Sequence, residues 1–407
     1  MRVCNNPPMS VDHVSAVRTT PAGYFKESDC HLADLVELAQ IQTDITEYPH
    51  AIDVISNVLI YDAPALASTL ADPTASRILE AEVAQALMSG PGIVVFKQAF
   101  ADTEVIDRAS RVFFDIIEAE KADGTAKGDH FGKPGANNRI WNALEKLAVI
   151  DPDTFVDYYS NDIIAFISRA WLGPNYQITS QINVVNPGGA AQTVHRDYHL
   201  GFQSNSLAEQ FPAHVHYLSP VLTLQGAVAH VDMPVESGPT LYLPHTQKYG
   251  PGYLAWRIPE FREYFEANYI QLPLEKGDMV YFNPALFHAA GNNISSDIRR
   301  MANLLQVSSA FGRAMETIDR ERVAGAIFGS LRKAKEVGGF SERQIANAIA
   351  SSAEGYSFPT NLDRDQPIGG LAPLTQAEIV AQAIAEDWDE DKLVKAIAEQ
   401  AQRKRSS

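Results

Sequence analysis

The hydrophobic pattern between residues 176 and about 311 is that of short β-strands. Such runs, bounded by turn residues, are typical of strands. Because no helical segment follows each run, the pattern favours an antiparallel sandwich or jelly roll over a parallel sheet with crossover helices. The expected strands are the apolar runs at 177–185, 221–231, 240–243, 278–282 and 302–308, which Gly, Pro and Asn separate.

The segments on either side of this block have helical spacing. A Gly-Pro-Gly turn and a short apolar strand at 90–96 precede amphipathic patterns at 102–116 and 151–172. Beyond residue 313, two sequences that begin at Ser341 and Thr375 have the form of capping boxes that open apolar-periodic helices. Residues 1–75 show weak periodicity and several turn signals, which indicates an irregular extension with short helices.

Together these patterns predict an α+β fold with a mainly β core. A double-stranded β-helix, or jelly roll, is expected at about 176–312, flanked by N-terminal helices and a C-terminal helical extension. The expected division is an irregular extension at 1–75, a main domain at 76–312 and a helical extension at 313–407. The C-terminal helices are a candidate surface for a homo-oligomer.

Composition and charge limit the classes of partner that the protein is expected to bind. The chain has 407 residues, 45% of them apolar, and a formal charge of −17. A field of this sign repels phosphate backbones and anionic lipid, so we expect a small-molecule partner and neither nucleic acid nor a membrane. The two cysteines, Cys4 and Cys30, form no metal-binding pair, and no secretory signal or membrane-length apolar run is present. A cytoplasmic location is therefore expected.

A candidate metal motif follows a turn at 186–189. In an extended chain, residues i and i+2 face the same way, so His195 and Asp197 can present an imidazole and a carboxylate to one point. Such a triplet also arises by chance, and a surface salt bridge is the alternative interpretation.

A second cluster strengthens the metal hypothesis. His288 lies on a strongly apolar background after the strand at 278–282, and Arg299 precedes the strand at 302–308. A buried core histidine is the alternative for His288. A guanidinium pointing into a barrel is costly unless it meets an anion. Two histidines and one carboxylate form the facial triad of non-haem Fe(II), which leaves coordination positions for a 2-oxo acid and dioxygen.

At this point a family resemblance is evident. The segments 187–199, 236–246, 276–278 and 288–299 resemble, in order and spacing, the phytanoyl-CoA dioxygenase family of Fe(II)/2-oxoglutarate oxygenases. The likeness also includes the strand and helix at 90–120, so it spans roughly 90–312. It implies that the main domain at 76–312 is an oxygenase domain. The implied cofactors are Fe(II), 2-oxoglutarate and O2, with ascorbate supportive in vitro.

Carried over residue by residue, the resemblance implies that His195, Asp197 and His288 are the catalytic iron ligands. It implies that Arg299 binds the distal carboxylate of 2-oxoglutarate; Arg300 would point to the opposite face of an extended chain. This chain departs from the family at Ala290, where a hydroxylated residue is frequent, and at Asn186, where a lysine is frequent. Asn186 is accordingly a candidate cofactor contact.

The expected reaction is hydroxylation of an unactivated C–H of a small organic metabolite, with succinate and CO2 as co-products. Related halogenases have a small residue in place of the carboxylate, and Asp197 fills that place. A loop at 130–141 supplies Arg139 and Trp141 as candidate substrate contacts, and His199 is a third. The alternatives are a non-catalytic metal-binding jelly-roll protein that acts as a binder or sensor, and a zinc hydrolase of a different fold.

Overall fold

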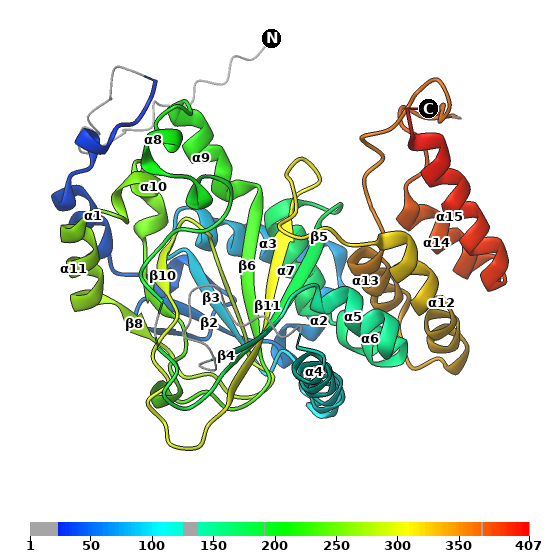
Figure 1. The fold of residues 1–407 in the computed structure, drawn as a ribbon, viewed down its shortest axis with the longest axis horizontal. Helices are drawn as coiled ribbons and strands as arrows, with labels where there is room; N and C mark the ends of the chain where they lie inside the picture. Colours follow the sequence, from blue (N-terminus) through cyan, green and yellow to red (C-terminus); the bar gives the residue numbers. More distant parts are fainter. Residues whose placement is uncertain (1–22, 125–136, 191, 368, 407) are drawn as a thin grey trace, which may run out of the picture.

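The computed structural model describes residues 23–124, 137–190, 192–367 and 369–406. Its strands form a large sheet in the order β1-β2-β3-β9-β6-β11-β5-β4 and a small sheet in the order β10-β7-β8 (Figure 1). The strands of the large sheet are β1 (Asp53–Ile55), β2 (Val58–Asp62), β3 (Ile93–Lys97), β4 (Asn137–Ile140), β5 (Gln177–Val185), β6 (Thr223–Ala229), β9 (Met279–Phe282) and β11 (Arg300–Ser308). Those of the small sheet are β7 (Leu241–Leu243), β8 (Ile270–Gln271) and β10 (Phe287–Ala289).

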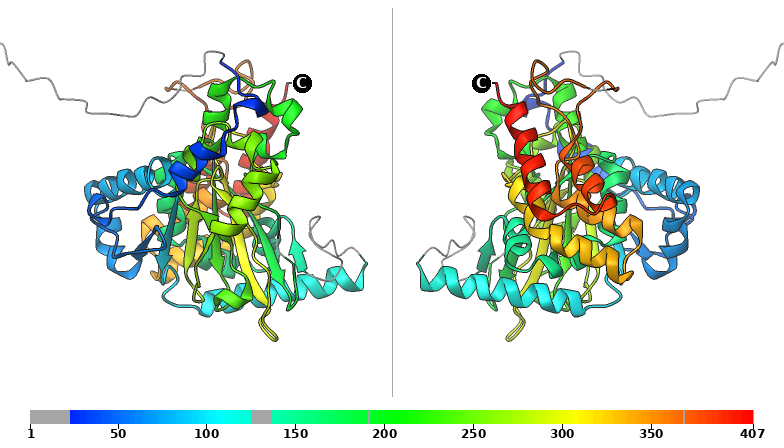
Figure 2. Two further views of the ribbon diagram at one scale, coloured as in Figure 1. Left: turned by 90° about the vertical axis from the view of Figure 1, so that its left-hand side faces the viewer. Right: turned by 90° about the vertical axis from the view of Figure 1, so that its right-hand side faces the viewer.

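Helices pack on one face of the large sheet and at both ends of the molecule. Figures 1 and 2 show α1 and α11 at one end and α12 to α15 at the other. Among the described residues, no helix combines the length and apolar character needed to cross a membrane. The helices are α1 (Leu32–Ala39), α2 (Ala67–Ala71), α3 (Pro73–Met88), α4 (Glu104–Ala122), α5 (Ala143–Ile150), α6 (Pro152–Tyr159), α7 (Asp162–Leu172), α8 (Asn205–Ala208), α9 (Ala213–Val221), α10 (Gly252–Ala255), α11 (Pro259–Asn268), α12 (Arg320–Val337), α13 (Glu342–Ser352), α14 (Gln376–Ala385) and α15 (Glu390–Lys404).

The large sheet is buried on both faces. On β3, Val94 and Phe96 pack into the core shared with the helices, whereas Ile93 and Val95 pack into a second core on the opposite face. Successive side chains of a strand point to opposite faces, so a strand covered on both sides has a continuous apolar run. This explains why the run at 93–96 does not alternate with polar residues.

Several predicted elements are confirmed. The strand at 177–185 is observed with the predicted bounds as β5, and the two predicted capping boxes open α13 and α14. The helical stretch at 151–172 is instead two helices, α6 and α7. Asn161 lies between them and caps α7, since its side chain accepts hydrogen bonds from the amides of Ile163 and Ile164.

The prediction that residues 1–75 are irregular is wrong for 53–62. There β1 and β2 form a hairpin through Ser56 and Asn57, both at positive φ (51° and 68°), and β2 pairs in parallel with β3. The pairing of Leu59 with Val94 joins positions that are distant in sequence, and no local periodicity indicates such a contact. The large sheet therefore extends into the segment expected to lie outside the main domain.

A buried polar chain links the large sheet to the helices. His230, only 2% exposed, forms hydrogen bonds of 2.9 Å to the hydroxyls of Ser110 and Tyr158. Burial, reinforced by the charge of Lys276 and opposed by that of Asp107, lowers the pKa of His230 to about 3. Between about pH 3 and pH 6.5 the imidazole is therefore neutral in the folded protein and protonated in the unfolded chain.

We expect His230 to make the protein less stable as the pH falls below about 6.5. Between the unfolded and folded pKa values the unfolded chain binds the extra proton, so this group's contribution to stability is lost progressively with acidification. From about pH 7 to about pH 5 the loss is about 2 kcal/mol. Urea unfolding of wild type and His230→Gln at both pH values measures it. An equal decline in the two proteins would contradict this assignment.

Candidate active site

A cavity of about 660 Å³ lies between the two sheets. Inward-facing residues of β3, β6, β9 and β11 form one wall, and residues of β7 and β10 form another. This volume is typical of small-molecule sites. The lining includes Val95, Ala227, Val280, Tyr242 and His288, together with side chains from the segment at 192–202.

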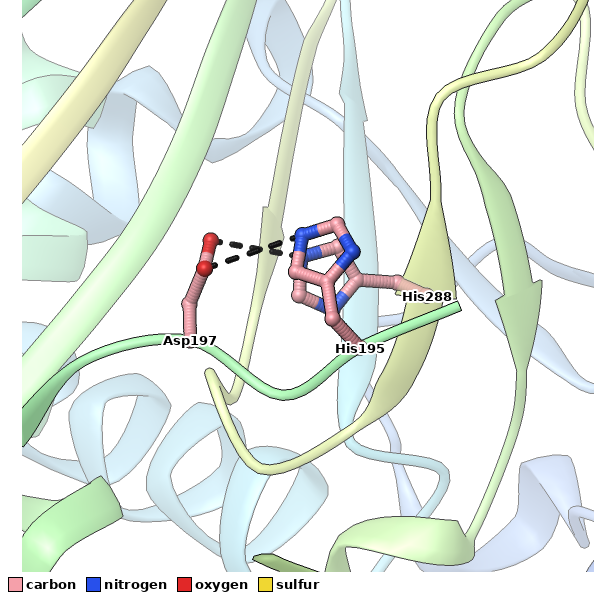
Figure 3. A group of neighbouring side chains, drawn as sticks. All are labelled: His195, Asp197 and His288. Atoms are coloured by element: carbon pink, nitrogen blue, oxygen red, sulfur yellow. Dashed lines mark ion pairs between the residues drawn. The ribbon is translucent and has the colours of Figure 1, made fainter. Parts of the chain in front are cut away.

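Backbone pairing brings the two predicted histidines together. His195 and His288 form an isolated antiparallel bridge, in which the His195 amide donates to the His288 carbonyl (2.9 Å) and the His288 amide donates to the His195 carbonyl (3.2 Å). Residues directly opposite in such a bridge have side chains on one face. The imidazole ring centroids are accordingly 4.5 Å apart (Figure 3).

Asp197 completes the cluster from two residues beyond His195. One carboxylate oxygen lies 3.6 Å from His195 Nε2 and the other lies 3.5 Å from His288 Nε2 (Figure 3). The ligand atoms of the three side chains all lie within 4.8 Å of one another. Burial alone would raise the pKa of Asp197, but the two imidazoles and the amide of Gln225 outweigh it and hold the pKa below its usual range.

Both imidazoles are held in the tautomer suited to a metal ligand. His195 Nδ1 lies 2.8 Å from the Thr193 carbonyl oxygen, and His288 Nδ1 lies 2.9 Å from that of Leu286. A carbonyl oxygen only accepts hydrogen bonds, so each Nδ1 must donate. In the neutral rings the lone pair is then on Nε2, the atom that faces Asp197. Metal-binding histidines are commonly oriented by such a bond.

Arg196 lies between His195 and Asp197 in sequence, but its side chain points away from theirs. Its guanidinium is buried between the rings of Tyr253 (5.3 Å) and Phe287 (5.1 Å) and donates to the Thr246 carbonyl at 2.5 Å. Burial lowers its pKa to about 10. Because Phe287 is adjacent to His288, this contact ties the segment of His195 and Asp197 to the strand of His288. The sequence pattern did not reveal this role.

The expectation that Arg299 points into the barrel is wrong. Arg299 is exposed, and its guanidinium lies 4.8 Å from the ring of Phe114 on α4. Strand β11 begins at Arg300, which is in phase with Ala302 and Leu304 and lines the cavity with them. Arg299 and Arg300 point to opposite faces, as predicted, but Arg300 rather than Arg299 faces the cavity.

Arg300 is one of the arginines that line the cavity, together with Arg139, Arg257 and Arg262. It is 6% exposed, and its Nη1 atom is buried with no hydrogen-bond partner among the described residues. Burial lowers its pKa to about 10, with Tyr242 opposing the shift. A buried guanidinium that lacks a partner fits an anionic group such as a carboxylate.

The remaining predicted residues divide into two groups. Arg139 and Trp141 line the cavity, with the guanidinium of Arg139 5.0 Å from the Trp141 ring. The rest of that predicted loop, up to residue 136, lies outside the described residues. Asn186 and His199 are not among the residues that line the cavity, so the contacts expected of them stay predictions.

Local backbone geometry determines where these two residues lie. Tyr198 and His199 have positive φ values of 62° and 42°, which end the extended segment directly after Asp197. His199 then begins a 3-10 helix, η4 (His199–Phe202), where burial lowers its pKa. Asn186 lies in the turn after β5, where its carbonyl accepts a hydrogen bond from the Gly189 amide (2.9 Å).

Comparisons with known proteins agree with this geometry. Residues 74–301, more than half of the chain, match the family described as Phytanoyl-CoA dioxygenase (PhyH). The chain belongs to this family. Fe(II), 2-oxoglutarate and dioxygen, the cofactors predicted from the sequence, agree with that membership and with the cluster of His195, Asp197 and His288. No curated protein matches the chain in sequence.

Solved structures give weaker similarities. The non-heme alpha-ketoglutarate-dependent epimerase SnoN, in complex with Fe3+, alpha-ketoglutarate and nogalamycin RO, is 17% identical over 59% of this chain and 85% of SnoN, with a TM-score of 0.38. EvdMO1 is 18% identical over 57% of this chain and 50% of its own, with a TM-score of 0.41. AviO1 from Streptomyces viridochromogenes Tue57 is 15% identical over 57% of this chain and 97% of its own, with a TM-score of 0.41.

Proposed function

We propose that this protein is an Fe(II)/2-oxoglutarate-dependent dioxygenase that hydroxylates an unactivated C–H of a small organic metabolite and releases succinate and CO2. The observation that supports it best is the convergence of His195, Asp197 and His288 at a cavity into which Arg300 also points. We interpret the two facing sheets as the double-stranded β-helix expected of such an enzyme.

The residues present fit the cofactors. The Nε2 atoms of His195 and His288 and the carboxylate of Asp197 would hold Fe(II), a donor set typical of non-haem iron oxygenases. Arg300, with its unpaired Nη1, would bind the distal carboxylate of 2-oxoglutarate. When bound, iron and 2-oxoglutarate supply the activation of dioxygen and the oxidation of the C–H bond.

The chain's own residues orient the donors and exclude water. The Thr193 and Leu286 carbonyls fix the imidazoles, and Gln225 Nε2 donates to Asp197 Oδ2 and fixes the carboxylate. The cavity wall between the sheets is apolar at Val95, Val280 and Phe282. Such a wall limits competing reactions with water.

The carboxylate also favours hydroxylation over halogenation. A halide ligand requires the position that Asp197 occupies in this cluster, and Gln225 holds that carboxylate in place. We therefore propose a hydroxylase rather than a halogenase.

Succinate formation tests the proposed function. Purified protein is supplied with Fe(II), 2-oxoglutarate, ascorbate and dioxygen, with and without a library of metabolites, and succinate is quantified. We expect slow succinate release without substrate and faster release with the right one. Absence of any turnover in wild type, with Fe(II) bound by wild type and lost in His288→Ala, would indicate a non-catalytic binding protein. Activity with zinc in the absence of dioxygen would indicate a hydrolase.

A further inference from the structure

We propose that the substrate is a molecule rich in hydroxyl or amino groups, recognised by the side-chain amides of Gln225 and Gln306. This inference rests on the proposed function, because it names the substrate class of the same site. It is carried by two buried amide oxygens that line the cavity without a hydrogen-bond partner among the described residues.

The two glutamines are neighbours on adjacent strands. Gln225 of β6 and Gln306 of β11 are directly opposite each other in the antiparallel register. Cross-strand partners have side chains on one face, and both side chains line the cavity. They are 7% and 6% exposed, so both are shielded from bulk solvent. The pair therefore forms a polar strip on a wall that is otherwise apolar at Ala227 and Leu304.

The contact with Asp197 fixes which amide atom of Gln225 is available. Its Nε2 donates to the carboxylate, and a carboxylate can only accept, so the amide cannot be reversed. Gln225 Oε1 is consequently the atom left without a partner, and it is an acceptor. It lies on the side chain that contacts the metal-site carboxylate. A substrate bound next to the metal would therefore meet a group that requires a hydrogen-bond donor.

Gln306 on the adjacent strand β11 also has a buried amide that needs a hydrogen-bond partner. Its Oε1 has no hydrogen-bond partner among the described residues, and neither has Oδ1 of Asn183, which lines the cavity from β5. The unpaired acceptor of Gln225 and the unpaired amide of Gln306 on the adjacent strand suit two hydroxyl or amino groups of one molecule, as on neighbouring carbons of a polyol or amino sugar. A hydrocarbon chain in this place would leave both amides buried and unsatisfied, which proteins strongly disfavour.

Binding of defined probes tests this inference without knowledge of the natural substrate. The probes are myo-inositol, glucose and glucosamine, with cyclohexanol and 1-hexanol as hydrocarbon-rich counterparts. Trp141 and Trp256 line the cavity, so quenching of tryptophan fluorescence reports occupancy. Titrations use wild-type protein, both metal-free and under anaerobic conditions with Fe(II) and 2-oxoglutarate. We expect at least one polyol or amino sugar to bind about tenfold more tightly than either hydrocarbon-rich probe.

A matched pair of variants localises the effect. Gln306→Met keeps the side-chain length and removes the amide, and we expect it to weaken binding of the polyols about tenfold. Gln177→Met makes the same change on β5 outside this cavity, where Gln177 Nε2 donates to Glu354 at 2.9 Å, and we expect unchanged probe binding. Should Gln306→Met fail to fold, the comparison of probes on the wild type still decides.

Three results would overturn the inference: tighter binding of cyclohexanol or 1-hexanol than of every polyol, polyol binding unaffected by Gln306→Met, or succinate release stimulated by the hydrocarbon-rich probes alone. The last of these would leave the dioxygenase function intact. Polyol binding that depends on Gln306, without any succinate formation, would support the inference while the proposed enzymatic function fails. The two hypotheses are thus separated by the outcome.

Discussion

Asp197→Ala is expected to abolish succinate formation, with a loss of at least about a thousandfold. The substitution removes the only anionic member of the cluster and leaves His195 and His288 with no carboxylate between them. Loss of groups that merely orient a metal ligand already costs about 10- to 100-fold in affinity or activity, so loss of a ligand costs more. Iron content after anaerobic reconstitution and succinate release measure the effect.

The matched control for this variant is Asp232→Ala. Asp232 is an exposed carboxylate beyond the end of β6, where it accepts a hydrogen bond of 2.9 Å from the Lys276 amide. We expect this variant to retain iron and activity. If Asp197→Ala binds iron and forms succinate at the wild-type rate, the cluster is not the metal site and the proposed function is wrong.

Local periodicity predicted the strands that have turn residues at both ends. The run at 177–185 matches β5 because a Gly-Pro turn precedes it and an Asn-Pro-Gly-Gly turn follows it. The hairpin of β1 and β2 was missed because Ser56 and Asn57 are a weak turn signal, and because its main stabilising contact is the remote pairing with β3. The residue pattern of a short segment does not predict parallel pairing with a distant segment.

The site shows the same distinction between local and remote information. His195 and Asp197 share a face through local geometry, whereas the bridge between His195 and His288 joins distant segments and was not predicted. The sequence placed His288 in the same site only through the chemistry of the facial triad and the family resemblance. Both faces of β11 are buried, so apolar residues occur at odd and even positions alike. Alternation of hydrophobicity therefore could not show which of two adjacent arginines faces the cavity.

That ambiguity supplies the second large prediction: Arg300→Met is expected to raise the KM for 2-oxoglutarate by at least about 30-fold, with a smaller effect on kcat. Truncating one partner of a buried charge pair costs about 2–5 kcal/mol, and each 1.4 kcal/mol corresponds to a factor of about ten. Arg299→Met is the matched control, because Arg299 stacks on Phe114 outside the cavity. Initial rates over a range of 2-oxoglutarate concentrations compare the two variants.

Stability measurements distinguish cosubstrate binding from a structural role of Arg300. In the protein without cosubstrate, the Arg300 guanidinium is buried with an unpaired Nη1, a destabilising arrangement that an apolar side chain of similar length removes. We therefore expect Arg300→Met to be at least as stable as wild type without 2-oxoglutarate and to gain little from its addition, whereas wild type gains stability through binding. A variant that is destabilised without cosubstrate, with an unchanged KM, would show that Arg300 holds the fold and that another cation binds the oxo acid. If the charge of Arg300 serves to bind 2-oxoglutarate, its removal is expected to lower the affinity for 2-oxoglutarate without lowering the stability of the protein.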